Sequence, residues 1–282
     1  MKTRQIVIQD FTGVYAEQPF MQRLRELAGQ ESARRNAEIR YIDCTGLPGT
    51  DCYCDDEAVE SIRKGIAEAG ITDAHGIHFF DNGNYHYMSK IWTDMVQEPF
   101  TLVVFDHHPD MQEPRFGNIL SCGGWVKKVL EENKFVDNVV IIGAADHLVE
   151  EIPPHDKVTF IPESEIISLS SLVSPKGITS TTGQSPECRI SRLSSNLYIS
   201  IDKDALFPAY AATNWDQGSL SLEHMKAIIN AIAKDRRIIG MDICGERARD
   251  FAGDEQHSVQ AADALNDRTN RELVDFLQDF LQ

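Results

Sequence analysis

The chain has 282 residues, of which 42% are hydrophobic and 25% charged, a composition typical of folded globular proteins rather than disordered or collagen-like ones. Its 44 acidic and 27 basic residues give a formal net charge of −17, which argues against nucleic acid as a partner because phosphate groups bind to basic surfaces. No apolar stretch approaches the roughly 18 residues of a membrane span, and no signal-peptide pattern opens the chain. The six cysteines show no CxxC spacing. We therefore expect a cytoplasmic protein with reduced thiols and no membrane partner.

Short β-branched runs alternate with helical patterns along the whole chain. A strand at 6–8 is followed by helices at 20–36 and 55–69, a strand at 76–80, a helix at 86–97, a strand at 101–105 and a helix at 121–133. Strands at 138–143, 158–161 and 197–201 come next, then a helix at 221–235, a strand at 237–241 and a helix at 257–281. Several strands are continuously apolar, which is typical of parallel strands buried on both faces.

This alternation predicts a doubly wound α/β fold, with a parallel sheet between two layers of helices. No break in composition marks a domain boundary, so we expect one domain over residues 1–282. Residues 170–195 are rich in Ser, Thr, Gly and Pro. Because a regular strand follows them, we interpret this segment as a surface insertion within the domain.

Polar side chains follow almost every expected strand. In an open parallel sheet, ligands bind beyond the carboxyl ends of the strands. The segments at these positions are DNGNYHYMS after 76–80, DHHPDMQ after 101–105, AADHL after 138–143, DKDALFP after 197–201 and DICGE after 237–241. Acidic and His residues gathered at one edge of the sheet indicate a binding site rather than a solvated surface.

The strongest of these clusters lies at 106–110. Asp106, His108 and Asp110 are spaced by two residues. In an extended segment their side chains point to one side, and His107 points to the other. The same spacing puts Asp202 and Asp204 on one side of a second strand end, with the intervening lysine reversed.

Four carboxylates at neighbouring strand ends repel one another, at about 4 kcal/mol per pair for a 4 Å separation and an effective dielectric near 20. Two divalent cations would balance the four charges. Carboxylates with imidazoles and no thiolate suit manganese. The alternative is that these aspartates cap helices that follow the strands. The two clusters together favour a metal site.

At these residues the sequence resembles the arginase, agmatinase and formiminoglutamase superfamily of binuclear manganese hydrolases. The family motif Asp-Ala-His-x-Asp is matched by DHHPD at 106–110, and Ser-x-Asp-x-Asp by SIDKD at 200–204. The first family motif, Gly-Gly-Asp-His-Ser, is echoed weakly by GNYHY at 83–87. The resemblance implies the arginase-like three-layer α/β/α fold, a homo-oligomer and two Mn²⁺ ions.

The resemblance also implies which residues bind these ions and how the reaction proceeds. A hydroxide bridging the two ions would attack the guanidinium or amidine carbon of a small molecule, and an amine would leave. Asp204 would accept a hydrogen bond from this hydroxide. One ion would be held by His86, Asp106, Asp110 and Asp202, and the other by Asp106, His108, Asp202 and Asp204.

The strand end at 242–246 supplies a further candidate. The family places a Glu in the pattern Asp-Ile-x-Glu, where it contacts the cationic group of the substrate. In DICGE the Glu comes one residue later, so Glu246 is the implied catalytic and substrate-binding residue. The alternative for Glu246 is a solvated loop position. Asp242 is expected to support a metal ligand rather than bind metal itself.

Two segments depart from the family pattern. The family stretch Gly-Asn-x-His-Gly corresponds to GNILS at 117–121, which keeps Asn118 as a substrate contact but puts Leu120 where a proton-transferring His would be. We predict that His147 replaces this His, the alternative being a solvated loop residue. The family's Gly-Thr-Pro region is replaced by TNWDQG, in which Trp215 and Asp216 are suited to bind a cation.

The sequence thus supports two hypotheses of different classes. The first is a binuclear manganese hydrolase that cleaves a guanidino or amidino C–N bond, for which L-arginine is expected to be a poor substrate. The second is a catalytically silent, metal-binding relative that serves as a ligand-binding or assembly subunit. A third option keeps the metals but hydrolyses an amide. Retention of the carboxylates favours the first hypothesis, and the missing His favours the second.

Overall fold

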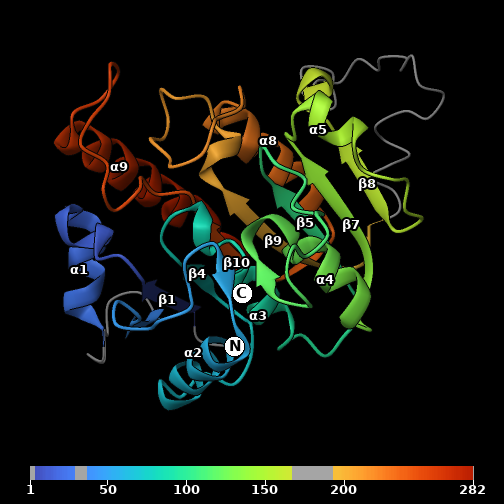
Figure 1. Cartoon of the computed structure of the whole chain (residues 1–282), viewed down its shortest axis with the longest axis horizontal. Coiled ribbons are helices and arrows are strands. Elements are labelled where there is room, and N and C mark those ends of the chain that lie inside the picture. The colour runs from blue at the N-terminus through green and yellow to red at the C-terminus, as the bar shows by residue number, and fades with distance from the viewer. Residues whose placement is uncertain (1–3, 29–36, 167–192, 282) are drawn as a thin grey trace.

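The computed structural model describes residues 4–28, 37–166 and 193–281. Within them the chain forms an eight-stranded, all-parallel sheet (Figure 1). From one edge to the other the strands are β2 (Ala37–Asp43), β1 (Arg4–Asp10), β4 (Ile77–Phe79), β10 (Arg237–Cys244), β9 (Asn196–Asp202), β5 (Phe100–Phe105), β7 (Val136–Ile142) and β8 (Val158–Ile161). A separate antiparallel ribbon pairs β3 (Tyr53–Cys54) with β6 (Leu120–Ser121).

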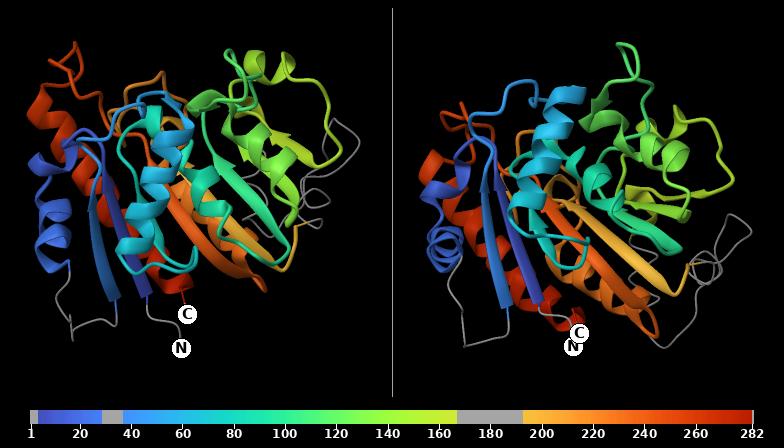
Figure 2. Two further views of the ribbon diagram at one scale, coloured as in Figure 1. Left: turned by 60° about the horizontal axis from the view of Figure 1, so that its bottom comes forward. Right: turned by 90° about the horizontal axis from the view of Figure 1, so that it is seen from below.

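Helices cover both faces of the sheet, which confirms the predicted doubly wound fold (Figures 1 and 2). One face packs against α1 (Pro19–Leu27), α8 (Leu222–Ala233) and α9 (Val259–Leu277). The other packs against α2 (Asp56–Glu68), α3 (Met88–Thr93) and α4 (Trp125–Glu132). The strands are apolar on both faces. In β1, for example, Ile6 and Ile8 pack in the core on the side of α1, α8 and α9, and Val7 packs in the core on the side of α2, α3 and α4.

Shorter helical elements connect these layers. Helix α5 (Asp146–Glu150) follows β7, and six 3₁₀ turns are described, at η1 (Val14–Glu17), η2 (Gly83–Tyr85), η3 (Cys122–Gly124), η4 (Glu163–Glu165), η5 (Lys203–Ala205) and η6 (Gln278–Phe280). No helix in the described part of the chain is long and apolar enough to cross a membrane.

Several expected boundaries differ from the observed ones. Strand β2 was not predicted, although the segment AEIRYID alternates charged and apolar residues as a half-buried strand does; it is an edge strand that pairs only with β1. The expected helix at 20–36 ends at Leu27, and residues 29–36 lie outside the described ones. The helix expected from 121 begins at Trp125, after β6 and η3. Most of the predicted insertion at 170–195 also lies outside the described residues.

The strand order positions the functional residues. Strands β4, β10, β9 and β5 are neighbours at the centre of the sheet, although β4 and β5 come from the first half of the chain and β9 and β10 from the second. Because all four are parallel, their carboxyl ends meet at one edge. A change in strand order of this kind opens the crevice where ligands bind in α/β sheets.

Candidate metal centre

The carboxyl ends of the four central strands bring the predicted metal ligands together. His86 follows η2, which comes after β4, and the 106–110 cluster follows β5 directly. Asp202 ends β9 and Asp204 lies in η5. All six predicted ligands are buried except His108, whose side chain is 22% exposed: His86, Asp106, His108, Asp110, Asp202 and Asp204.

Three carboxylates surround the imidazole of His86. Its Nδ1 lies 3.0 Å from Oδ2 of Asp106, 3.1 Å from Oδ2 of Asp110 and 3.6 Å from Oδ2 of Asp202. The Sγ of Cys244, at the end of β10, lies 3.2 Å from the same Asp202 oxygen. These atoms form two overlapping groups that could hold a metal ion, one with Asp106 and Asp110 and one with Asp202 and Cys244.

A second ligand group forms around His108. Its Nδ1 lies 3.0 Å from Oδ2 of Asp204 and 3.5 Å from Oδ1 of Asp106. Asp106 therefore contributes one oxygen to the group around His86 and the other to the group around His108. Such a shared carboxylate is what two adjacent cations require.

The crowding of these acids shifts their pKa values. Burial and the neighbouring Asp106 raise the pKa of Asp110 to about 7. Burial, Asp202 and Asp106 likewise raise the pKa of Asp204 well above its usual range. For Asp106 itself, burial raises the pKa, but hydrogen bonds from His108 and His86 outweigh burial and lower it. Two imidazoles therefore neutralise the cluster only in part.

The donor set fits divalent cations. Oδ2 of Asp106 is buried in the middle of the cluster, 3.0 Å from Nδ1 of His86. Burying a carboxylate is costly unless a cation balances its charge, and a metal ion at this point would do so. Carboxylate oxygens and imidazole nitrogens are ligands for zinc, manganese and other first-row divalent metals.

Neighbouring groups fix the orientation of the ligands. Nε2 of His86 lies 2.9 Å from Oγ of Ser200, which is 3.0 Å from Oγ of Ser89, and Ser89 donates to Asp242 at 3.1 Å. This chain of contacts leaves Nδ1 of His86 free to face the carboxylates. The expected supporting position of Asp242 agrees with this geometry. The indole of Trp125 donates a 2.6 Å hydrogen bond to Oδ2 of Asp110.

A cavity of about 350 Å³ opens above the cluster, and Trp215 forms part of its wall. The Trp215 side chain is 43% exposed, and its ring meets that of His108 edge-on at 5.7 Å. Asp216 lies 3.1 Å from Nε2 of His108. Asp216 is thus placed to orient a metal ligand, a contact that the sequence analysis did not predict. Its expected contact with a substrate cation stays a prediction.

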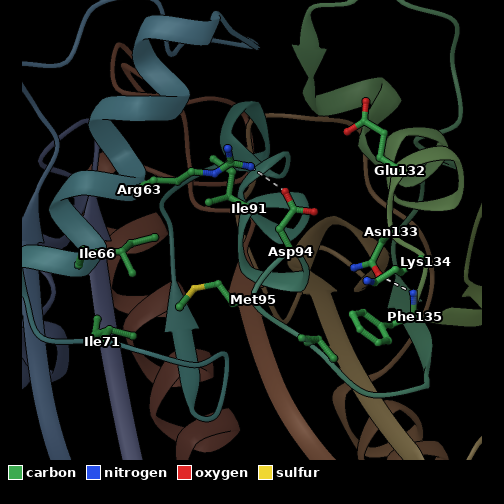
Figure 3. A pocket seen from close by; sticks show the side chains of 12 residues that line it. Arg63, Ile66, Ile71, Ile91, Asp94, Met95, Glu132, Asn133, Lys134 and Phe135 are labelled. Atoms are coloured by element: carbon green, nitrogen blue, oxygen red, sulfur yellow. Dashed lines mark hydrogen bonds and ion pairs between the residues drawn. The ribbon is translucent and has the colours of Figure 1, made fainter.

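A larger cavity of about 510 Å³ lies between α2, α3 and the end of α4 (Figure 3). Its polar wall includes Arg63 and Asp94, whose side chains form a 2.8 Å ion pair. Ile66, Ile91 and Phe135 provide apolar lining. None of the candidate metal groups among the described residues lies here, so the cavity above the His86 and His108 groups is the candidate site.

The residues expected to converge do so, but in a local conformation that differs from the expected one. Strand β5 ends at Phe105, and the cluster that follows is a loop in which Asp110 has a φ of +49°. His107 belongs to none of the candidate ligand groups among the described residues, and its Nε2 lies 3.7 Å from Asp216. Lys203 does point away from the cluster, but from a 3₁₀ turn rather than a strand.

The expected substrate-binding role of Glu246 conflicts with its contacts. Its side chain is buried and turns toward α9, where Oε1 lies 2.5 Å from Nζ of Lys203 and 2.8 Å from Nδ2 of Asn270. Gln18 donates to its other oxygen at 2.7 Å. A carboxylate with an internal cation and amide donors on both oxygens is not free to bind a substrate cation.

Three further predicted positions lie away from the cavity wall. His147 is exposed on α5, where the neighbouring Leu148 lines the cavity instead. Asn118 is exposed, and its carbonyl accepts a hydrogen bond from Lys128. Leu120 pairs with Cys54 in the small ribbon. Among the described residues that line the cavity, the imidazoles are those of His86 and His108, so the structure does not bring His147 to the cavity as its predicted proton-transfer role requires.

Cys244 was not among the predicted site residues, because the strand was expected to end at residue 241, whereas β10 continues to Cys244 and pairs it with Asp202. Cys244 stands two residues after Asp242, so the alternation used for the other strand ends would have placed both side chains toward the cluster. The predicted ligand set contains no thiol, and the structure adds the Cys244 thiol to the groups that could hold an ion.

Comparisons with known proteins agree with this architecture. The model of the arginase family matches residues 24–265. An uncharacterized protein of Thermotoga maritima is 30% identical over 242 residues, which cover 86% of this chain and 79% of the relative.

Solved structures show the same fold at low sequence identity. Agmatine ureohydrolase of Thermoplasma volcanium is 15% identical with a TM-score of 0.61, covering 97% of this chain and 89% of that one. Proclavaminate amidino hydrolase of Streptomyces clavuligerus is 17% identical with a TM-score of 0.61, covering 98% and 92%. Formimidoylglutamase of Bacillus subtilis is 13% identical with a TM-score of 0.61, covering 99% and 88%. These likenesses confirm the expected three-layer fold.

The buried pair of Lys203 and Glu246 generates a stability prediction. Lys203→Ala should lower the free energy of unfolding by about 3–5 kcal/mol, because it leaves a buried carboxylate without its cation. The matched control is Lys226→Ala, whose partly exposed pair with Glu272 is worth less than about 1 kcal/mol. Urea denaturation of both variants measures the difference. Equal, small effects would contradict the structural role of the buried pair.

Metal binding should stabilise the folded protein, because cations relieve the repulsion among the clustered carboxylates. A metal present at a hundredfold excess over its Kd adds about 2.7 kcal/mol to the free energy of unfolding. We expect chelator-treated protein to melt at a lower temperature and to recover on addition of manganese, zinc or cobalt. Calorimetric scans measure this shift. An unchanged melting temperature with all three metals would show that the cluster does not bind cations.

Proposed function

Because the chain belongs to the arginase family, we propose that it is a binuclear, metal-dependent hydrolase that cleaves a guanidino or amidino C–N bond of a small molecule. The observation that supports this most directly is the position of Asp106, whose two oxygens face His86 and His108 at the floor of one cavity. Two ligand groups joined by one carboxylate suit two adjacent ions.

The ions would supply the reactive chemistry: a divalent pair lowers the pKa of a bound water and polarises the carbon that this water attacks. Asp106, Asp110, His86 and Asp202 would hold one ion, and Asp106, His108 and Asp204 the other. Manganese is the metal that the family resemblance implies. Ser200 would hold His86, and Asp216 would hold His108, in the orientation that binding requires.

Residues of the chain would carry out proton transfer and substrate binding. Oδ2 of Asp204, which lies 3.0 Å from Nδ1 of His108, would accept the proton of the attacking water and return it to the leaving nitrogen. The half-exposed face of Trp215 is suited to pack against a planar cationic group. Because His147 is not available at the cavity, this assignment leaves proton transfer to a carboxylate rather than to a third imidazole.

Asp106→Asn tests whether catalysis depends on the shared carboxylate. The substitution preserves side-chain size but removes a charge from both ligand groups, so we expect it to abolish both metal occupancy and turnover. Asp275→Asn, at an exposed position on α9, is the matched control and should retain both. Elemental analysis and steady-state rates are measured on the same preparations. A metal-free but fully active Asp106→Asn variant would overturn the proposal.

The choice of substrate provides a second test. A polar group left unpaired in a dry pocket costs about 1–3 kcal/mol, and the amino and carboxylate ends of arginine both need partners. We expect arginine to be a poor substrate compared with agmatine, guanidinobutyrate or formiminoglutamate, measured as kcat/KM with the metal-loaded protein. Arginine as the best substrate by a wide margin would contradict this specificity. No release of urea, ammonia or amine from any compound would favour the silent relative.

A further inference from the structure

Strand β10 brings a thiol into the group of ligands around His86. Cys244 is 1% exposed and pairs in register with Asp202, and its Sγ lies 3.2 Å from Oδ2 of that carboxylate. The next residue, Gly245, has a φ of +87°, and a Cβ at this position would lie 2.4 Å from Oδ1 of Asp202. A glycine is therefore required for the end of β10 to approach Asp202 so closely.

The spacing of the donor atoms is that of ligands around a single ion. With metal–ligand bonds of about 2.0–2.3 Å, neighbouring ligand atoms lie roughly 3.0–3.7 Å apart. Nδ1 of His86 lies 3.0, 3.1 and 3.6 Å from the oxygens of Asp106, Asp110 and Asp202. The 3.2 Å between Cys244 and Asp202 falls in the same range.

We propose that Cys244 coordinates, as a thiolate, the ion held by His86 and Asp202. This inference rests on the metal centre of the proposed function and changes its expected metal. Binding forms a metal–sulfur bond and releases the thiol proton to solvent. Nitrogen, oxygen and thiolate together favour zinc, cobalt(II) or iron(II) over manganese. The group of Asp106, His108 and Asp204 contains no sulfur, so the two halves of the centre differ in metal preference.

Cobalt(II) reports thiolate coordination directly. A thiolate bound to cobalt(II) gives an intense charge-transfer absorption in the near ultraviolet, whereas d–d bands in the visible report the bound ion whatever its ligands. We expect both features in the cobalt-loaded protein. Cys244→Ser should remove the near-ultraviolet band and keep the visible bands. Cys122→Ser is the matched control, because Cys122 lines the same cavity outside the ligand groups, and it should keep both.

The outcomes separate this inference from the proposed function. Visible bands without a near-ultraviolet band in the unaltered protein would show that Cys244 is not a ligand, while the metal centre itself would stand. No bound cobalt at all would overturn the metal centre. If Cys244→Ser does not fold, the triple variant Cys52→Ser/Cys122→Ser/Cys188→Ser decides, because it removes the two other thiols that line the cavity among the described residues and the one cysteine that lies outside them. Persistence of the near-ultraviolet band in it assigns the band to Cys244, and its loss overturns the assignment.

Metal competition gives an independent measurement. Loss of an outer-shell partner costs a metal site about 10–100-fold in affinity, and loss of a direct ligand should cost at least as much. We therefore expect Cys244→Ser to reduce the preference for zinc over manganese by at least about tenfold, with Cys122→Ser unchanged. An identical zinc preference in both variants would contradict coordination by Cys244.

Discussion

Repulsion among buried carboxylates at one edge of a parallel sheet is the main constraint on this site. Asp106, Asp110, Asp202 and Asp204 all lie against the imidazoles of His86 or His108 and are almost completely shielded from water. Two imidazoles offset part of their charge, and the pKa of Asp110 is still raised to about 7. A cation bound among these carboxylates would lower their pKa values and favour their full ionisation.

At the same edge of the sheet another buried acid is neutralised from within the chain. Glu246 comes two residues after β10, and Lys203 balances its charge. In the segment 202–204 the two aspartates face the carboxylate cluster and the lysine between them faces Glu246. The expected contact of Glu246 with a substrate cation therefore conflicts with the ion pair that this carboxylate already makes.

Local patterns predicted the fold because it depends on short-range periodicity, and they picked out six candidate ligands that the structure brings together. Continuous apolar runs marked the buried strands, and parallel pairing then placed the acidic segments together. Residues whose positions depend on long-range packing were predicted poorly. Glu246 and His147 both follow strands, but the contacts that turn them away come from α9 and from the position of α5. Cys244 was missed because the end of β10 was placed three residues too early.

Metal stoichiometry tests the central claim most directly. Purified protein, stripped by chelator and titrated with zinc or cobalt by calorimetry, should bind two ions per chain, and Asp106→Asn should lose both sites because its carboxylate is shared by the two ligand groups. Asp110→Asn should weaken only the site around His86, since Asp110 belongs to that group alone. Binding of no ion to the unaltered chain, or two unaltered sites in Asp106→Asn, would contradict the account.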